Sequence, residues 1–164
     1  MLLVAACAAA TESGWERRQA ERKWREVEAA LPAYPRKEDL LPFFVSAASS
    51  FEFYIDGASL AVGEDGVVRY VLVARSAEGA ESVSFEGIRC STSEVRIYAT
   101  GSQDRGWTRS AGPWREIAPR SVQRWHNALR DEYFCPLGNP IGSPAEGVTA
   151  LRRGLHPSLA PTGN

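Results

Sequence analysis

The sequence predicts an α+β domain: an antiparallel β-meander of four or five strands, with two C-terminal helices packed on it and a charged N-terminal helix ahead of it. Residues 51–101 alternate apolar and polar side chains in short runs, as strands with one buried face do. Turn sequences interrupt these runs, namely Asp-Gly, Gly-Glu-Asp-Gly and Ala-Glu-Gly. Apolar residues recur at helical spacing on either side of this stretch, which places helices before and after the sheet.

The composition suits one domain with an N-terminal extension. The chain has 164 residues, and its 44% hydrophobic content excludes a mainly disordered protein. A net charge of −1 argues against nucleic acid as a partner. With two distant histidines, and no phosphate or dinucleotide motif, we predict neither a metal site nor a cofactor.

Residues 1–10, MLLVAACAAA, are typical of the remnant of an export signal. The run from Val4 to Cys7 fits a lipobox, in which the cysteine becomes a lipid-modified N-terminus, and the alanines after it also fit an ordinary signal cleavage site. The third alternative is an apolar terminus without function. Because only six residues precede Cys7, we expect the natural start to lie upstream. Ala8 follows the cysteine, which favours an anchor in the outer membrane.

Residues 11–39 are predicted to form a charged helix and a proline-rich linker. Apolar side chains recur at three- and four-residue steps through residues 11–30, and Pro32 ends the helix. The folded domain is expected to span residues 40–157, and residues 158–164 to form a disordered tail.

The predicted strands follow the alternating runs at residues 51–56, 59–62, 67–76, 81–90 and 93–101. The run at 67–76 is apolar on both faces, so we expect a central strand covered on both sides. Gly87 in the following run indicates a bulge or a close backbone approach.

Two helices are predicted after the sheet. The first begins at a capping Ser121 and continues to about Phe134, with its apolar stripe at three- and four-residue steps. The second is marked by Ser143 and Glu146, which form a capping box with proline at the first helical position. Gly154 is the predicted C-terminal stop.

Cys90 and Cys135 remain once Cys7 is set aside. An even pair of cysteines in an exported protein suggests a disulfide, whereas two buried free thiols are the alternative. A bridge across this spacing would stabilise the fold by about 4 kcal/mol in the chain-entropy model.

A binding face is predicted where arginines alternate with tryptophans after the sheet. Arginine and tryptophan are the residues that interface hot spots use, and such a surface can also hold an anionic glycan or a lipid headgroup. The alternative is solvated arginines over core tryptophans. The candidate residues are Trp107, Trp114, Arg115, Arg120 and Arg124.

A second candidate site consists of Glu86, Arg89, Glu94 and His126. If these side chains converge, they would serve an enzyme or ligand-binding protein acting on cell-envelope material, with His126 as the proton acceptor. The alternative is a structural histidine hydrogen-bonded beside Trp125.

Several segments together resemble the cryptic-neisserial-protein-like family over residues 33–157. They are LLPFFVSAAS, SLAVGEDGVVRYVLVARSAEGAESVSFEGIRC, YATG, YFCPLGNPI and LRRGLHP. These are small proteobacterial proteins with export signals, so the resemblance implies export and supports pairing of Cys90 with Cys135. It implies no catalytic residue and no cofactor.

From these observations we predict an exported protein of the periplasm, anchored to the outer membrane if Cys7 is lipidated. The lack of a recognisable catalytic motif in the sequence favours a non-enzymatic binding or assembly module with an envelope protein as partner. The enzyme or ligand-binding protein for envelope material is the alternative.

Overall fold

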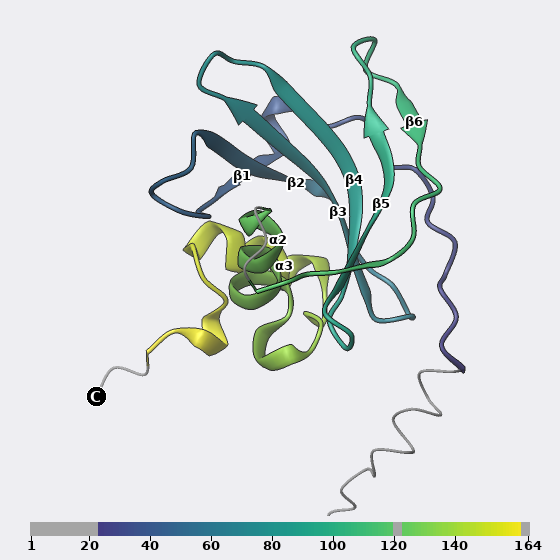
Figure 1. Cartoon of the computed structure of the whole chain (residues 1–164). Coiled ribbons are helices and arrows are strands. Elements are labelled where there is room, and N and C mark those ends of the chain that lie inside the picture. Colours follow the sequence, from purple (N-terminus) through teal and green to yellow (C-terminus); the bar gives the residue numbers. More distant parts are fainter. Residues whose placement is uncertain (1–22, 120–122, 162–164) are drawn as a thin grey trace, which may run out of the picture.

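The computed structural model describes residues 23–119 and 123–161, and its architecture is α+β, as predicted. Within these residues one antiparallel sheet has seven strands, in the order β1-β2-β3-β4-β5-β6, with β7 paired to β5 (Figure 1). The strands are β1 Leu40–Phe43, β2 Phe51–Val62, β3 Val67–Ser76, β4 Glu81–Arg89, β5 Glu94–Gly101, β6 Trp107–Arg109 and β7 Arg115–Glu116.

The predicted number of strands was too low, because β1, β6 and β7 are short and lie among prolines and glycines. The predicted turn at Asp56 was also wrong, since β2 runs through it with a register shift between Asp56 and Ala61. Ser59 explains this continuity: its hydroxyl donates to the Asp56 carbonyl at 2.7 Å and accepts from the amide of Val71 at 2.8 Å. A side chain therefore replaces the missing ladder bond at the bulge.

Strand β3 is central, and every residue from Val67 to Val73 is buried. Tyr70 and its alternate neighbours pack against the helices, and we call this side of the sheet the helix face. Val71 and Val73 pack with residues of β4 and β5 on the opposite side. The sheet therefore separates two hydrophobic clusters.

The helix face is covered by α2 Arg124–Ala128, continued by the π-helical turn η2 Leu129–Phe134, and by α3 Pro144–Arg153 (Figure 1). The first predicted helix is confirmed from Arg124 onward; its proposed cap, Ser121, lies outside the described residues. Short 3-10 helices complete the described chain, namely η1 Lys37–Asp39, η3 Pro136–Gly138 and η4 Pro157–Leu159. The predicted tail at 158–164 thus begins inside η4.

Both ends of α3 lie where they were predicted, but the capping box forms only in part, because the Glu146 carboxylate accepts from the amide of Gly142 at 2.7 Å, one residue before its predicted partner Ser143. The Ser143 hydroxyl accepts from the amide of Glu146 at 3.2 Å, and Gly154 ends the helix with a φ of 76°, in the left-handed region that favours glycine. The disulfide is confirmed as well. Cys90 and Cys135, 45 positions apart, are bonded with their Cα atoms 5.5 Å apart, so the end of β4 is joined to the end of η2.

The N-terminal segment differs from the prediction. Residues 24–30 were predicted as helix, but residues 24–36 form neither helix nor strand and run along the sheet opposite the helices (Figure 1). Trp24 and Leu31 repeat at helical spacing, yet contacts with the sheet outweigh this local preference. We call residues 24–35 the strap and the side of the sheet they cover the strap face. The remainder of the predicted helix, with Cys7, lies outside the described residues.

Candidate functional site

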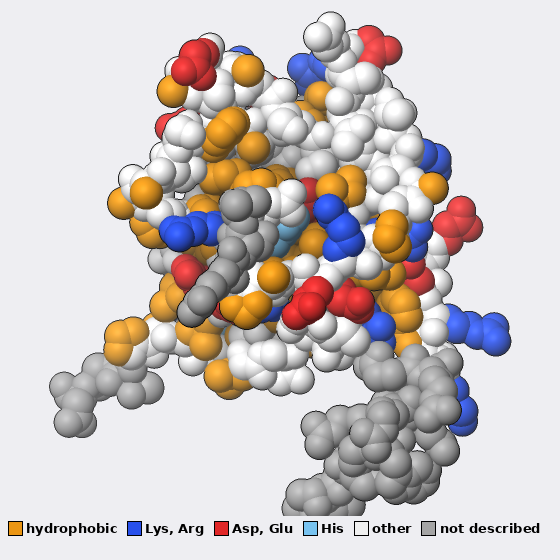
Figure 2. All heavy atoms as spheres, in the orientation of Figure 1, with side chains coloured by type: hydrophobic (Ala, Val, Ile, Leu, Met, Phe, Trp, Pro, Cys, Tyr) orange, Lys and Arg blue, Asp and Glu red, His pale blue; other side chains and the backbone are white. Residues whose placement is uncertain are grey.

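A groove of about 410 Å³ lies between the loop after β1 and the start of α2. Figure 2 shows hydrophobic side chains gathered in a hollow of the molecule between the sheet and this helix. We call it the aromatic groove. Its lining residues are Val45, Ser46, Ala48, Ser49, Ser50, Phe51, Phe53, Arg124 and Trp125.

Three aromatic rings form one side of the aromatic groove. Phe51 and Phe53 are alternate residues of β2, so they share a face, and their ring centroids lie 6.4 Å apart. Trp125 stacks on Phe53 with centroids 5.3 Å apart. Phe51 remains 47% exposed, and Arg124 beside it is exposed as well. Among the described lining residues there is apolar surface, one cation and no acidic side chain, which suits an apolar segment that carries a negative charge.

A buried carboxylate–imidazole pair lies behind the groove. Glu86 of β4 and His126 of α2 are each 3% exposed, and the Glu86 Oε2 atom lies 2.8 Å from Nε2 of His126. The hydroxyls of Tyr70 and Ser84 donate to the same carboxylate at 3.1 and 2.7 Å. A buried carboxylate is costly unless it is bonded in this way.

These contacts determine the charge of Glu86. Burial by itself raises the pKa of its carboxyl group, but the bond and charge of His126, together with the two hydroxyl donors, hold the pKa below its usual value. Burial and the neighbouring carboxylate raise the pKa of Tyr70 far above its usual value, so Tyr70 remains a hydroxyl donor.

Trp125 connects the groove to this pair. Its indole Nε1–H lies 3.1 Å from Nε2 of His126, the same nitrogen that contacts Glu86. One nitrogen cannot both accept from Trp125 and donate to Glu86. With Glu86 ionised, we assign the proton to Nε2, which then donates to the carboxylate.

The pair is not arranged for nucleophilic catalysis. In such a site the base lies between the nucleophile and the acid, whereas here the carboxylate lies between Ser84 and His126. Neither Glu86 nor His126 lines the aromatic groove. Across the described part of the chain, no group of three or more histidine, cysteine, aspartate or glutamate residues is placed to hold a metal ion.

The four residues of the second predicted site divide between the two faces of the sheet. Glu86 and His126 meet on the helix face. Arg89 contacts Glu94 at 4.0 Å, and its guanidinium lies 3.8 Å over the ring of Trp24 on the strap face. The sequence placed Glu86, Arg89 and Glu94 on neighbouring strands and His126 on a helix, but it did not show which face of the sheet each side chain would take.

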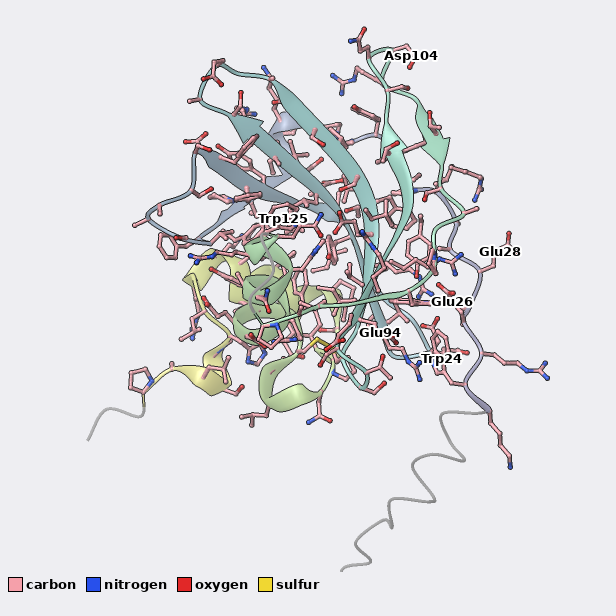
Figure 3. All side chains as sticks on the ribbon, in the orientation of Figure 1. Trp24, Glu26, Glu28, Glu94, Asp104 and Trp125 are labelled. Carbon is pink, nitrogen blue, oxygen red and sulfur yellow. A yellow bond between two sulfur atoms is a disulfide. The ribbon has the colours of Figure 1, made fainter. Side chains whose placement is uncertain are left out.

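The predicted arginine–tryptophan face is divided in the same way. Trp107 and Trp114 pack beneath the strap, Arg115 is exposed on β7, and Arg124 borders the aromatic groove. Arg120 lies outside the described residues. Figure 3 shows Trp125 beside α2, away from Trp24 and Glu26 of the strap. The aromatic groove itself was not predicted, since the loop at residues 45–50 brings no motif; the alternate Phe51 and Phe53 were its only signal.

Comparison with known families identifies the family of this chain. The model of the CNP1-like family matches residues 19–152. The chain belongs to the CNP1-like family. The matched region includes the strap, the whole sheet and most of α3, and it agrees with the resemblance found in the sequence. No curated protein and no solved structure matches this CNP1-like chain significantly.

A separate finding concerns membranes. In residues 23–119 and 123–161, no helix combines the length and apolar character needed to cross a bilayer.

Proposed function

We propose that this CNP1-like protein is an exported envelope protein that works as a non-enzymatic binding module, tethered to a membrane through Cys7. The aromatic groove is its contact surface, and its partner is an envelope protein that inserts an apolar segment carrying a negative charge. The observation that carries the proposal is the stacked surface of Phe53 and Trp125 beside the exposed Phe51 and Arg124.

Two further features support this proposal. Aromatic side chains and arginine are enriched at the centres of protein interfaces, where they contribute most of the binding free energy. The disulfide between Cys90 and Cys135 is the kind of bond that persists in an oxidising compartment such as the periplasm. The alternative, an enzyme or ligand-binding protein for envelope material, depended on four residues converging, and they lie in two separate pairs.

Site-specific photo-crosslinking in the native host tests the contact surface. A photoreactive amino acid at Ser49, an exposed residue of the groove, should give one dominant protein adduct. The same amino acid at Asp104, in an exposed loop far along the chain, serves as the matched control. Adducts of equal yield at both positions would contradict the proposal.

Charge reversal shows whether the groove selects the partner. Arg124→Glu should remove most of the Ser49 adduct while the free energy of unfolding stays within about 0.5 kcal/mol, because the residue is exposed. Lys37→Glu reverses another exposed cation and should leave the adduct unchanged.

Metabolic labelling tests the tether independently. The protein expressed from its natural gene should incorporate labelled palmitate and sediment with membranes, whereas Cys7→Ser should do neither. A natural protein that stays unlabelled and free in the periplasm would rule out the lipid anchor and leave the groove proposal standing.

A further inference from the structure

The strap is held in the manner of a bound peptide. Side chains of β3 and of the hairpin before it contact its backbone at Val27: the Val27 amide donates to Asp65 at 2.8 Å, and Arg69 donates to the Val27 carbonyl at 2.9 Å. Farther along, Trp107 donates to the carbonyl of Pro32 at 2.9 Å. Side-chain bonds to the backbone of an extended, proline-containing segment are the way in which peptide-recognition domains hold their ligands.

A carboxylate site on the strap face holds Glu26 of the strap. The Glu26 carboxylate accepts from Arg96 at 2.6 Å, from the Tyr98 hydroxyl at 2.6 Å and from the Trp114 indole at 3.2 Å. Arg69 lies 4.0 Å away. Burial, and then the bond to Glu26, raise the pKa of Tyr98, which therefore remains a donor. Two cations and two neutral donors around one carboxylate make a selective anion site.

An aromatic site lies two residues ahead of it. The Trp24 ring packs under the guanidinium of Arg89 at 3.8 Å and edge-to-face against Trp114, with centroids 6.0 Å apart. Its indole N–H donates to the Asp65 carbonyl at 2.9 Å. Cation–π and aromatic contacts of this kind select a tryptophan or another aromatic residue.

The receiving surface belongs to the sheet rather than to the strap. Arg69 is on β3, Arg96 and Tyr98 are on β5, and Asp65 is in the hairpin between β2 and β3. The Tyr98 ring lies over β4 at Gly87. A Cβ atom at this position would lie 2.9 Å from the Tyr98 hydroxyl, so only glycine leaves room for the ring. The Nε atoms of Arg69 and Arg96 are buried and have no acceptor among the described residues, so the cluster retains hydrogen-bonding capacity after Glu26 is bound.

We propose that the strap face is a receptor for an extended segment of a partner protein in which an aromatic residue stands two positions before a carboxylate. In this chain the strap fills the receptor with its own Trp24 and Glu26. Charge complementarity identifies the partner, since the site surrounds a carboxylate with arginines. This surface is separate from the aromatic groove and does not depend on the function proposed for it.

The strap competes with the partner because it is covalently attached. A short linker gives an attached ligand an effective concentration of the order of millimolar. A free peptide of the same sequence therefore binds the intact chain far more weakly than a chain whose strap is impaired. This difference is measurable, and it separates a receptor from a permanently packed segment.

The test is peptide binding to the full-length protein, followed by fluorescence anisotropy. The probe is a labelled peptide of residues 23–36, and the protein is the Trp24→Ala/Glu26→Gln variant. We expect saturable binding to this variant and at least tenfold weaker binding to the unchanged protein. Adding Arg96→Gln to the variant should abolish binding. A peptide with Glu26→Gln should bind at least tenfold more weakly, and a peptide with Glu28→Gln, an exposed residue of the same segment, should bind as before.

Other results of these experiments would contradict the proposal. If the variant binds no peptide, or if the two altered peptides bind alike, the strap face is not a receptor for this pattern. If the unchanged protein forms a dimer that the peptide dissociates, the occupant is a second copy of this chain, and the partner-protein assignment is overturned. If the variant does not fold, hydrogen exchange of the unchanged protein decides: a Val27 amide that exchanges only by global unfolding would refute the proposal.

Discussion

The two faces of the sheet are closed by different means. On the helix face, Leu129, Tyr133 and Phe134 are fully buried, and a disulfide fixes the end of η2 to β4. On the strap face, Trp24, Glu26 and Ala29 are only partly buried, and hydrogen bonds from side chains hold the covering segment. We therefore expect the helix face to belong to the cooperative core and the strap to open while that core stays folded.

We expect the largest effect on the free energy of unfolding from removal of the disulfide on the helix face. Replacing both cysteines, Cys90→Ala and Cys135→Ala, should lower the free energy of unfolding by about 4 kcal/mol, because the bridge closes a loop of 45 positions. Urea denaturation of the oxidised protein and the double variant measures the difference. A loss below about 1 kcal/mol would mean that helix packing alone closes this face.

We expect the second-largest effect on stability from loss of the buried contact between Glu86 and His126. His126→Ala leaves the Glu86 carboxylate buried without the donor that His126 provides, so we expect a loss of about 3 kcal/mol. His156→Ala is the matched control, because that histidine is also buried but its partner, Glu146, is partly exposed. Equal losses in the two variants would contradict a special cost at Glu86.

The same pair predicts how stability depends on pH. The pKa of Glu86 is lower in the folded chain than its usual value of 4.5, so its contribution is fully present above that value and is lost as the pH falls through the folded pKa. The stability difference between the unchanged protein and Glu86→Gln should therefore shrink as the pH falls below about 4.5. Denaturation curves from pH 6 to pH 3 test this, and a constant difference would contradict it.

We expect the smallest effect from a change in the strap, which should alter hydrogen exchange in the strap but not in the core. Glu26→Gln weakens the bonds from Arg96, Tyr98 and Trp114, so the opening free energy at the Val27 amide should fall by about 1–2 kcal/mol. Amides of β3 should exchange as before. Glu28→Gln should change neither set, and hydrogen exchange followed by NMR reports both. Equal acceleration in β3 would show that strap and core unfold together.

Local sequence signals predicted much of the helix face. Ser143 and Gly154 mark the ends of α3 because their conformations depend on neighbouring residues alone. The α+β class followed from the alternation of side chains over residues 51–101, and the central strand followed from the run at 67–76, which is apolar on both faces; both signals are local. The disulfide followed from the cysteine count and the expected compartment.

The strap could not be predicted from local signals. Its apolar residues have helical spacing, but the contacts that determine its path involve residues about 40 to 90 positions away, such as Asp65 and Trp114. The bulge in β2 was missed for a similar reason, since Ser59 completes the ladder only when Val71 lies opposite it. The second predicted site was divided for a related reason. Successive residues of a strand point to opposite faces of the sheet, and the sequence does not show which face each residue takes.

The clamped strap has a mechanical consequence. A pull on the chain ahead of Lys23 reaches the contacts of Trp24, Glu26 and Val27 first, and then those of Pro32 and Pro35, before it reaches β1. The force therefore acts on these contacts in order along the strap before it acts on the edge of the sheet. We therefore expect a pull on the N-terminal end to break the contacts of the strap one after another before its force reaches the hydrogen bonds between β1 and β2.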